Sequence, residues 1–259
     1  MRERTLPGGE RLTFDPEPHV YELDGDAIPS VTQVLNVLHK PALVWWGMVT
    51  GVEGLCSLDR DGHLGNGWAE DPEATAKLLT EHKLTVNHVR DKAGVRGSAA
   101  HRALEDYAKS GKVPRLDDYP DEERGYIRAI ASWIVDTEPE FLESEVMVAS
   151  VEHRYAGTLD VRAVLGKGEF AGQTGLIDAK SSKRIYPDSH FPQLAAYELA
   201  SVECGYDPTD YQAVLRVAPT GKYELRPSCA EPQHFVGLKC AYDAVTSLKA
   251  AAKAQKAAT

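Results

Sequence analysis

Residues 155–182 read YAGTLDVRAVLGKGEFAGQTGLIDAKSS, and this stretch decides the fold. Apolar and polar residues alternate through 155–165 and again through 174–180, as in β-strands whose successive side chains face opposite sides of a sheet. The glycine-containing segment 166–173 lies between them and predicts a tight connection. The stretch therefore predicts two neighbouring strands of one sheet.

The segments around this pair extend the sheet and add helices. One more strand is predicted before it, at EVMVASVE (145–152), and a helix after it, at FPQLAAYELASVEC (191–204). YQAVLRVA (211–218) and KYELRPS (222–228) predict a hairpin, and a final helix begins near Pro232. This order predicts an α+β (or α/β) domain with a mixed central β-sheet flanked by helices.

The N-terminal part is predicted to hold a small β-hairpin followed by helices. LTFDPEPHVYELDGDAI (12–28) alternates around turn residues, and Ser30 is a good N-cap for a helix over 30–39 that Pro41 ends. The glycine-rich residues 51–70 predict a loop. Further helices are predicted at 72–91, at 95–111 with its end at Gly111, and at 121–137. We therefore divide the chain into an N-terminal region, 1–92, and a core, 93–259, which together form one compact domain.

The charge of the chain is unevenly distributed. Its 39 acidic and 29 basic residues give a formal net charge of −10, which at first argues against a nucleic-acid partner. Segment 82–102 nevertheless carries +4, between segments 41–81 at −5 and 103–145 at −7. An acidic exterior with one basic groove is compatible with DNA, and we expect contact to be confined to that groove.

Composition also bears on the compartment and on cysteine chemistry. No run of about 18 apolar residues occurs, and the opening MRERTLPGGERLTF lacks the apolar segment of a secretory signal, so we expect a cytoplasmic protein with no membrane partner. The four cysteines form no C-x-x-C pair, and we expect them to be reduced thiols: Cys56, Cys204, Cys229 and Cys240.

Two acidic residues and a lysine mark the strand pair as a candidate metal site. Asp178 and Lys180 lie two apart in one strand and face the same side, and pairing through the short turn can bring Asp160 beside them. Carboxylate oxygens arranged in this way suit Mg²⁺ or Mn²⁺. The alternative is a cross-strand salt bridge on a solvated face. The apolar neighbours of Asp178 weigh against it, because a buried Asp and Lys without a purpose are costly.

Helical segments on both sides of the strand pair add polar side chains. Gln193 and Tyr197 form an i, i+4 pair on one helix face, a spacing that is by itself usual for an ordinary helix. His101 lies on an upstream helix and would by itself be assigned a structural role. Basic residues lie close to it in the sequence: Arg90, Lys92, Arg96 and Arg102.

The order of four motifs resembles that of the PD-(D/E)XK nuclease superfamily. The motifs are GVRGSAAHRALEDY, YAGTLD, GLIDAKSS and QLAAY, and the opening HVYELDGDAIPSVTQVL is also similar to phage-encoded members. The likeness is greatest to the RecB-like exonuclease branch, which includes phage recombination exonucleases and CRISPR-adaptation nucleases. It covers most of residues 12–200 and implies a restriction-endonuclease-like nuclease core.

The resemblance implies a role for each matching residue. His101, Asp160, Asp178 and the backbone carbonyl of Ala179 would bind one or two Mg²⁺ or Mn²⁺ ions, and Lys180 would orient or deprotonate the attacking water. Gln193 and Tyr197 would complete the site against the DNA strand, with Glu145 a candidate for an outer or second-metal role. Further DNA contacts are expected from Arg90, Lys92, Arg96, Arg102, Ser181, Lys183 and Arg184.

The implied function is a metal-dependent DNA exonuclease of phage recombination, repair or end processing. A structure-specific or single-strand endonuclease of the same fold and a non-catalytic DNA-binding subunit remain alternatives. The expected partners are DNA and a recombination or single-strand-annealing protein. Some RecB-like relatives bind an iron–sulfur cluster through four cysteines. We do not expect one here, because gaps of 25 and 11 residues replace the tight C-terminal spacing. The sequence leaves cleavage polarity, strand preference and homo-oligomer formation open.

Overall fold

The computed structural model describes residues 1–38 and 41–257, and for residues 41–42 and 92–98 it describes the backbone only. Contacts divide the chain into two compact units, Met1–Leu38 with Ala99–Thr259, and His39–Ser98. The sequence-based division places one boundary after residue 92. The two units are instead defined by which residues contact one another, and residues 1–38 therefore belong with the C-terminal part of the chain. The first unit contains both β-sheets.

The N-terminal residues of the first unit form a four-stranded antiparallel meander. It consists of β1 (Arg2–Thr5), β2 (Arg11–Asp15), β3 (Val20–Leu23) and β4 (Asp26–Ile28), in that order. The hairpin predicted over 12–28 is confirmed. Strand β1 was not predicted, since RERT has no apolar residue to alternate with its polar ones and pairs only through its contact with β2.

A short helix follows this sheet and begins where the sequence predicts. Ser30 Oγ accepts a hydrogen bond from the Gln33 amide at 3.1 Å, and Gln33 Oε1 accepts one from the Ser30 amide at 2.8 Å, forming a capping box. Helix α1 (Val31–Val34) continues into one 3₁₀ turn, Leu35–Val37, and Leu38 is already extended. The helix is therefore shorter than predicted, and its expected last residue, His39, lies outside the described residues.

The central sheet of the first unit has five strands and is mixed, as predicted. Its order is β5-β6-β7-β8-β9, and only the β7–β8 pair is parallel. Helix α6 (Pro187–Glu203) connects these two parallel strands, as a crossover must. The strands are β5 (Pro139–Ser150), β6 (Tyr155–Leu165), β7 (Thr174–Lys180), β8 (Tyr211–Val217) and β9 (Tyr223–Pro227).

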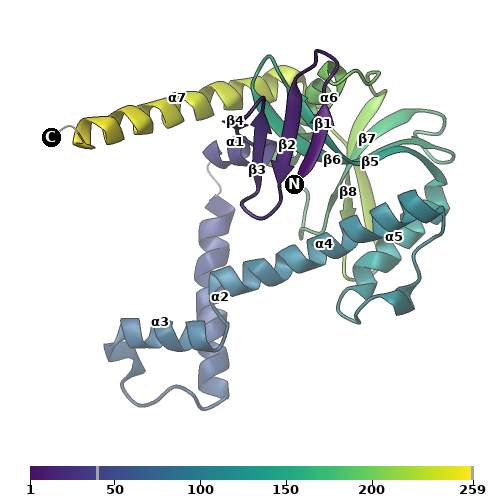
Figure 1. Cartoon of the computed structure of the whole chain (residues 1–259). Helices are drawn as coiled ribbons and strands as arrows, with labels where there is room; N and C mark the ends of the chain where they lie inside the picture. Colours follow the sequence, from purple (N-terminus) through teal and green to yellow (C-terminus); the bar gives the residue numbers. More distant parts are fainter. Residues whose placement is uncertain (39–40, 258–259) are drawn as a thin grey trace. The chain divides into compact units, whose positions relative to one another are not determined.

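Helices cover both faces of this sheet and bury two apolar clusters. On one face, α6, α7 (Pro232–Ala257), α1 and the N-terminal sheet enclose residues such as Leu159 and Val214. On the other face, α5 (Arg124–Thr137) and the Ala99–Ser110 end of α4 enclose residues such as Trp133. Both sheets and their helices are visible in Figure 1. The mixed α+β architecture is therefore confirmed.

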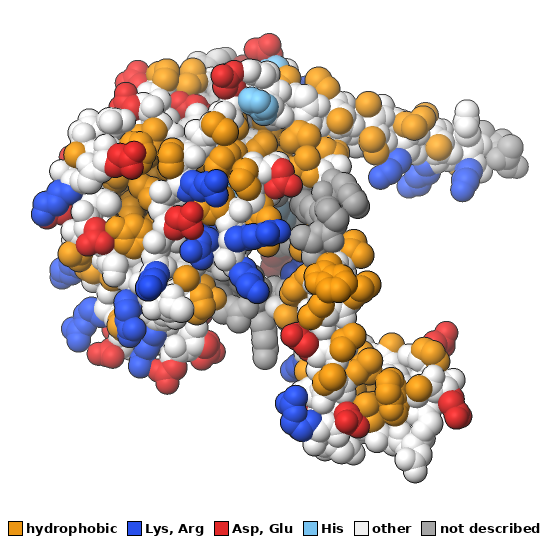
Figure 2. All heavy atoms as spheres, turned by 180° about the vertical axis from the view of Figure 1, so that it is seen from behind, with side chains coloured by type: hydrophobic (Ala, Val, Ile, Leu, Met, Phe, Trp, Pro, Cys, Tyr) orange, Lys and Arg blue, Asp and Glu red, His pale blue; other side chains and the backbone are white. Residues whose placement is uncertain are grey.

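Helix α7 packs on the first unit only near its N-terminus. Phe235 is fully buried, whereas residues 244–257 are exposed, and this end of the helix projects from the unit (Figure 1). Lysine side chains lie along the projecting end (Figure 2). Among the described residues, no helix has the length and apolar content that crossing a bilayer requires.

The second unit is helical, and here two sequence predictions were wrong. It contains α2 (Pro41–Arg60), a 3₁₀ turn at Trp68–Glu70, α3 (Pro72–Glu81) and the start of α4 (Val86–Ser110). Half of the predicted 51–70 loop is therefore helix. Gly54 in this helix allows close packing, since a Cβ at this position would lie 2.8 Å from Leu79 Cδ2. The helix predicted over 72–91 is interrupted at Lys83, whose φ is +57°.

Candidate functional site

Three acidic residues lie in one row across the central sheet. The register of β5 with β6 places Glu145 beside Asp160, between the pairs Ser144–Val161 and Val146–Leu159. The pairing of β6 with β7 ends at Val161 and Ile177, the residues next to Asp160 and Asp178, so Asp178 comes next in the row. Glu145 has a φ of +52°, a left-handed conformation that non-glycine residues seldom adopt. Asp160 and Asp178 are 6% and 1% exposed. Antiparallel pairing of the predicted strands thus brings these carboxylates together.

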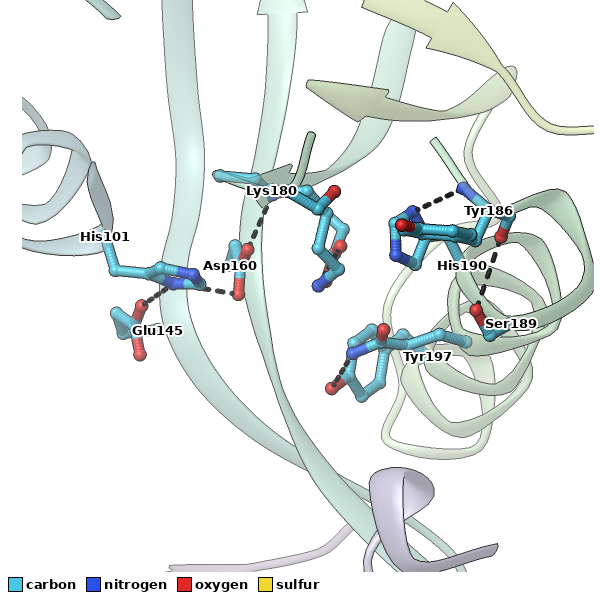
Figure 3. A network of polar contacts seen from close by, with 12 residues as sticks. His101, Glu145, Asp160, Lys180, Tyr186, Ser189, His190 and Tyr197 are labelled. Carbon is cyan, nitrogen blue, oxygen red and sulfur yellow. Dashed lines mark hydrogen bonds and ion pairs between the residues drawn. The ribbon is translucent and has the colours of Figure 1, made fainter. Parts of the chain in front are cut away.

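Helix α4 brings His101 to the end of this row. Ala99, Ala100, Ala103 and Leu104 are buried in the core, and this fixes the helix face that His101 presents. His101 Nδ1 lies 3.3 Å from Asp160 Oδ1 and 3.4 Å from Glu145 Oε1 (Figure 3). One potential ligand atom from each of the three residues lies within 4.8 Å of the others, so His101, Glu145 and Asp160 could hold a metal ion.

Asp160 is also tied to the neighbouring strand. Its Oδ2 accepts a hydrogen bond of 2.7 Å from the backbone amide of Ala179, the residue between Asp178 and Lys180. Burial raises the pKa of Asp160, but His101, Lys180 and the Ala179 amide together outweigh it, and the pKa is lowered overall. Attraction to Asp160 in turn raises the pKa of His101 to about 10, against the opposing effect of burial. The Asp160–His101 pair is therefore ionised at neutral pH in the metal-free protein.

Asp178 is less well accommodated. It forms an ion pair with Lys180 through Oδ2, whereas its buried Oδ1 has no hydrogen-bond partner among the described residues. Burial raises its pKa to about 6, and repulsion from Asp160 adds to this, although Lys180 opposes both. Burial lowers the pKa of Lys180, but Asp178 and Asp160 more than reverse this. Lys180 is thus an ammonium group in the metal-free protein.

One face of α6 lies on the Lys180 side of the site. Gln193 Nε2 donates a 3.0 Å hydrogen bond to Tyr197 OH, and both side chains are buried. The ring of Tyr197 lies against the GTLD motif, because a Cβ on Gly157 would come within 2.5 Å of Tyr197 Cε1. The predicted i, i+4 pair is therefore internally bonded.

His190 belongs to the same face and was not predicted. It lies three residues before Gln193 and seven before Tyr197, the spacing of a single helix face. Its Nδ1 accepts a 3.3 Å hydrogen bond from the Tyr186 amide (Figure 3), and burial, together with Lys180, lowers its pKa to about 4. The imidazole is neutral at pH 7, and the sequence signal that could have identified it was this spacing.

The expected DNA contacts lie in different settings. Arg96 and Lys92 fall outside the described side chains, and Arg90 belongs to the second unit. Arg102 pairs with the buried Glu123 at 2.8 Å. Ser181 is half-buried, whereas Lys183 and Arg184 are exposed just beyond β7, with the Arg184 guanidinium 5.0 Å from the centre of the Tyr186 ring.

Comparison of the chain with protein-family models gives no match, and neither does comparison with curated proteins. The chemistry of the site is therefore argued from its geometry and from the motif order of the sequence.

Proposed function

We propose that this chain is a divalent-metal-dependent deoxyribonuclease of the PD-(D/E)XK type that acts on DNA ends as an exonuclease. The observation that carries this proposal is the row of Glu145, Asp160 and Asp178, which has His101 at one end and Lys180 beside the other. Preference for DNA ends rests on the resemblance to RecB-like nucleases. So do a role in recombination or repair and an annealing partner protein, whereas the proposed cytoplasmic location rests on composition.

The donor set fits a hard divalent cation. Carboxylate oxygens are the ligands that Mg²⁺ and Mn²⁺ prefer, and Mn²⁺ also accepts an imidazole nitrogen. Asp178 supports the fit independently, because its buried Oδ1 lacks a hydrogen-bond partner among the described residues and the carboxyl has a raised pKa even with Lys180 on Oδ2. A buried, unsatisfied carboxylate is costly, and a cation beside it would remove that cost.

The side chains of the site have complementary tasks in phosphodiester hydrolysis. A bound divalent ion would supply polarisation of the phosphoryl group and a water of lowered pKa. The Lys180 ammonium would neutralise negative charge that develops on the phosphoryl oxygens, a role that its raised pKa favours over proton abstraction. The Ala179 amide keeps the Asp160 carboxylate oriented. Gln193 and Tyr197 would form the wall against which the strand lies.

Digestion of defined DNA tests this proposal. Linear DNA labelled at either end and circular DNA are incubated with Mg²⁺, Mn²⁺ or EDTA. We expect metal-dependent loss of linear DNA from one end, with circles spared. Asp178→Asn and Lys180→Met should abolish digestion while folding is retained. The matched control is Glu152→Gln, which changes an exposed carboxylate in the turn between β5 and β6 and should digest normally.

Each of the other possible results of this experiment would support a different conclusion. Nicking of circular DNA would favour the endonuclease alternative. DNA binding without digestion under any condition would overturn the enzyme assignment and favour a binding subunit. Full activity of folded Asp178→Asn would show that the row of carboxylates is not the active site.

A further inference from the structure

The strand that carries Glu145 is distorted at this residue. The φ of +52° at Glu145 occurs within β5, between residues that remain paired with β6 on both sides. Such a backbone conformation persists only where surrounding contacts enforce it, and it is frequent at functional sites. The same residue directs Oε1 to within 3.4 Å of His101 Nδ1. The distortion and the candidate metal ligand therefore coincide.

A side chain from the N-terminal sheet holds this distorted residue from outside. Arg2 Nη2 donates a 2.5 Å hydrogen bond to the backbone carbonyl of Glu145. The same kind of contact occurs two residues further along both strands. There Arg4 Nη1 donates a 2.8 Å hydrogen bond to the carbonyl of Met147. Strand β5 is at the edge of the central sheet, so these carbonyls have no neighbouring strand in the described chain. Side chains of β1 thus take the place of a missing strand.

We propose that Arg2 is a positioning residue for the metal centre. By holding the Glu145 carbonyl it keeps the backbone in the left-handed conformation, which directs the carboxylate toward His101 and Asp160. A return of Glu145 to an ordinary strand conformation would rotate its side chain about the backbone and remove the carboxylate from the cluster. This inference rests on the proposed function, and it adds a residue 143 positions away in sequence to the machinery of the site.

Two features separate this role from a charge effect. The hydrogen bond that Arg2 donates to Glu145 goes to its backbone carbonyl, so its effect on the ligand is conformational. Arg11 offers a matched comparison, because it belongs to the same sheet and pairs with the exposed Glu3 at 2.8 Å. Removing Arg11 takes the same charge from the sheet without touching β5.

A competing role for Arg2 is direct contact with DNA. A hollow of about 620 Å³ beside Glu145 is lined by Arg2, Arg4 and Tyr206, among others, and a phosphate could enter it. If Arg2 contacts DNA directly, its substitution should weaken DNA binding and leave metal affinity unchanged. If Arg2 positions Glu145, its substitution should weaken metal affinity and leave DNA binding unchanged. Metal binding in the absence of DNA therefore distinguishes the two.

The experiment is a Mn²⁺ titration of the full chain without DNA, followed by calorimetry or electron paramagnetic resonance. Arg2→Met should weaken Mn²⁺ binding about 10- to 100-fold, the range seen when a group that orients a metal ligand is removed. Arg2→Lys, which retains a donor, should recover most of the affinity, and Arg11→Met should bind as the wild type does. Saturating Mn²⁺ should restore the digestion rate of Arg2→Met.

The outcomes separate this proposal from the proposed function. Unchanged Mn²⁺ affinity in Arg2→Met, with a wild-type protein that binds metal and digests DNA, overturns the positioning role alone. A wild-type chain that binds no Mn²⁺ overturns both. If Arg2→Met does not fold, Arg2→Gln replaces it, and an affinity equal to that of the wild type again overturns the proposal.

Discussion

Replacing Asp178 by asparagine should stabilise the metal-free protein at neutral pH. The carboxylate is 1% exposed, its Oδ1 has no hydrogen-bond partner among the described residues, and the ionised Asp160 repels it. Its attraction to Lys180 only partly offsets these effects, because its pKa is still raised to about 6 from 3.8. Asparagine has nearly the shape of the protonated carboxyl and removes the charge that the fold disfavours.

The pH dependence follows from the direction of the shift. A group whose pKa is raised by folding favours the folded state fully below its unfolded pKa, and this contribution is lost as pH rises through the folded pKa. Compared with a permanently neutral side chain, Asp178 lowers the free energy of unfolding by about 1 kcal/mol at pH 4.5 and by about 3 kcal/mol at pH 7.5. The advantage of Asp178→Asn should therefore grow across this interval and level off above pH 7.

Urea unfolding in EDTA, followed by far-ultraviolet circular dichroism at several pH values, measures this difference. Asp160→Asn is the control, because the pKa of Asp160 is lowered from 3.8, so loss of its charge should destabilise the protein about equally at pH 4.5 and pH 7.5. Saturating Mn²⁺ should stabilise the wild type more than Asp178→Asn. An Asp178→Asn protein that is no more stable than the wild type at pH 7.5 would refute the reasoning.

Other residues around the site give measurable effects as well. Since the pKa of His101 is about 10, Mn²⁺ must displace a proton, so affinity should rise from pH 6 to pH 9; a flat profile contradicts this. Changing the exposed Lys183 and Arg184 to Gln should reduce the slope of log K against log salt for DNA binding by up to about 2, and an unchanged slope excludes them as phosphate contacts. Gly157→Ala forces a Cβ against Tyr197 and should cost about 1–3 kcal/mol in urea unfolding, but less in a Tyr197→Ala background.

The sequence predicts the central part of the site because that part depends on local periodicity. Alternation through 155–165 and 174–180 identifies both strands, and a short connection makes them antiparallel neighbours, so Asp160 and Asp178 must come close. The i, i+4 spacing of Gln193 and Tyr197 likewise needs only a helix.

Other parts of the structure depend on contacts that no local pattern encodes. Strand β1 has no apolar alternation, and its pairing with β2 and its bonds to β5 exist only in the folded chain. Glu145 could be placed beside Asp160 only once the β5–β6 register was known. Glycines at 51 and 54 predict a loop by propensity, yet both lie in α2, and at Gly54 close packing beside Leu79 favours a residue without a side chain.

Three unfavourable features of the metal-free fold lie together at the candidate metal site. Asp178 is buried with its Oδ1 unpartnered among the described residues, Glu145 has a strained backbone, and His101 keeps a proton that a metal ligand must lose. A stably folded protein tolerates few such costs, and selection for stability alone would remove them by simple substitutions. One divalent cation would offset all three, since it neutralises the carboxylates, uses the direction that Glu145 adopts and displaces the proton of His101. That a single ligand accounts for three unrelated costs is the strongest physical argument for a metal at this site.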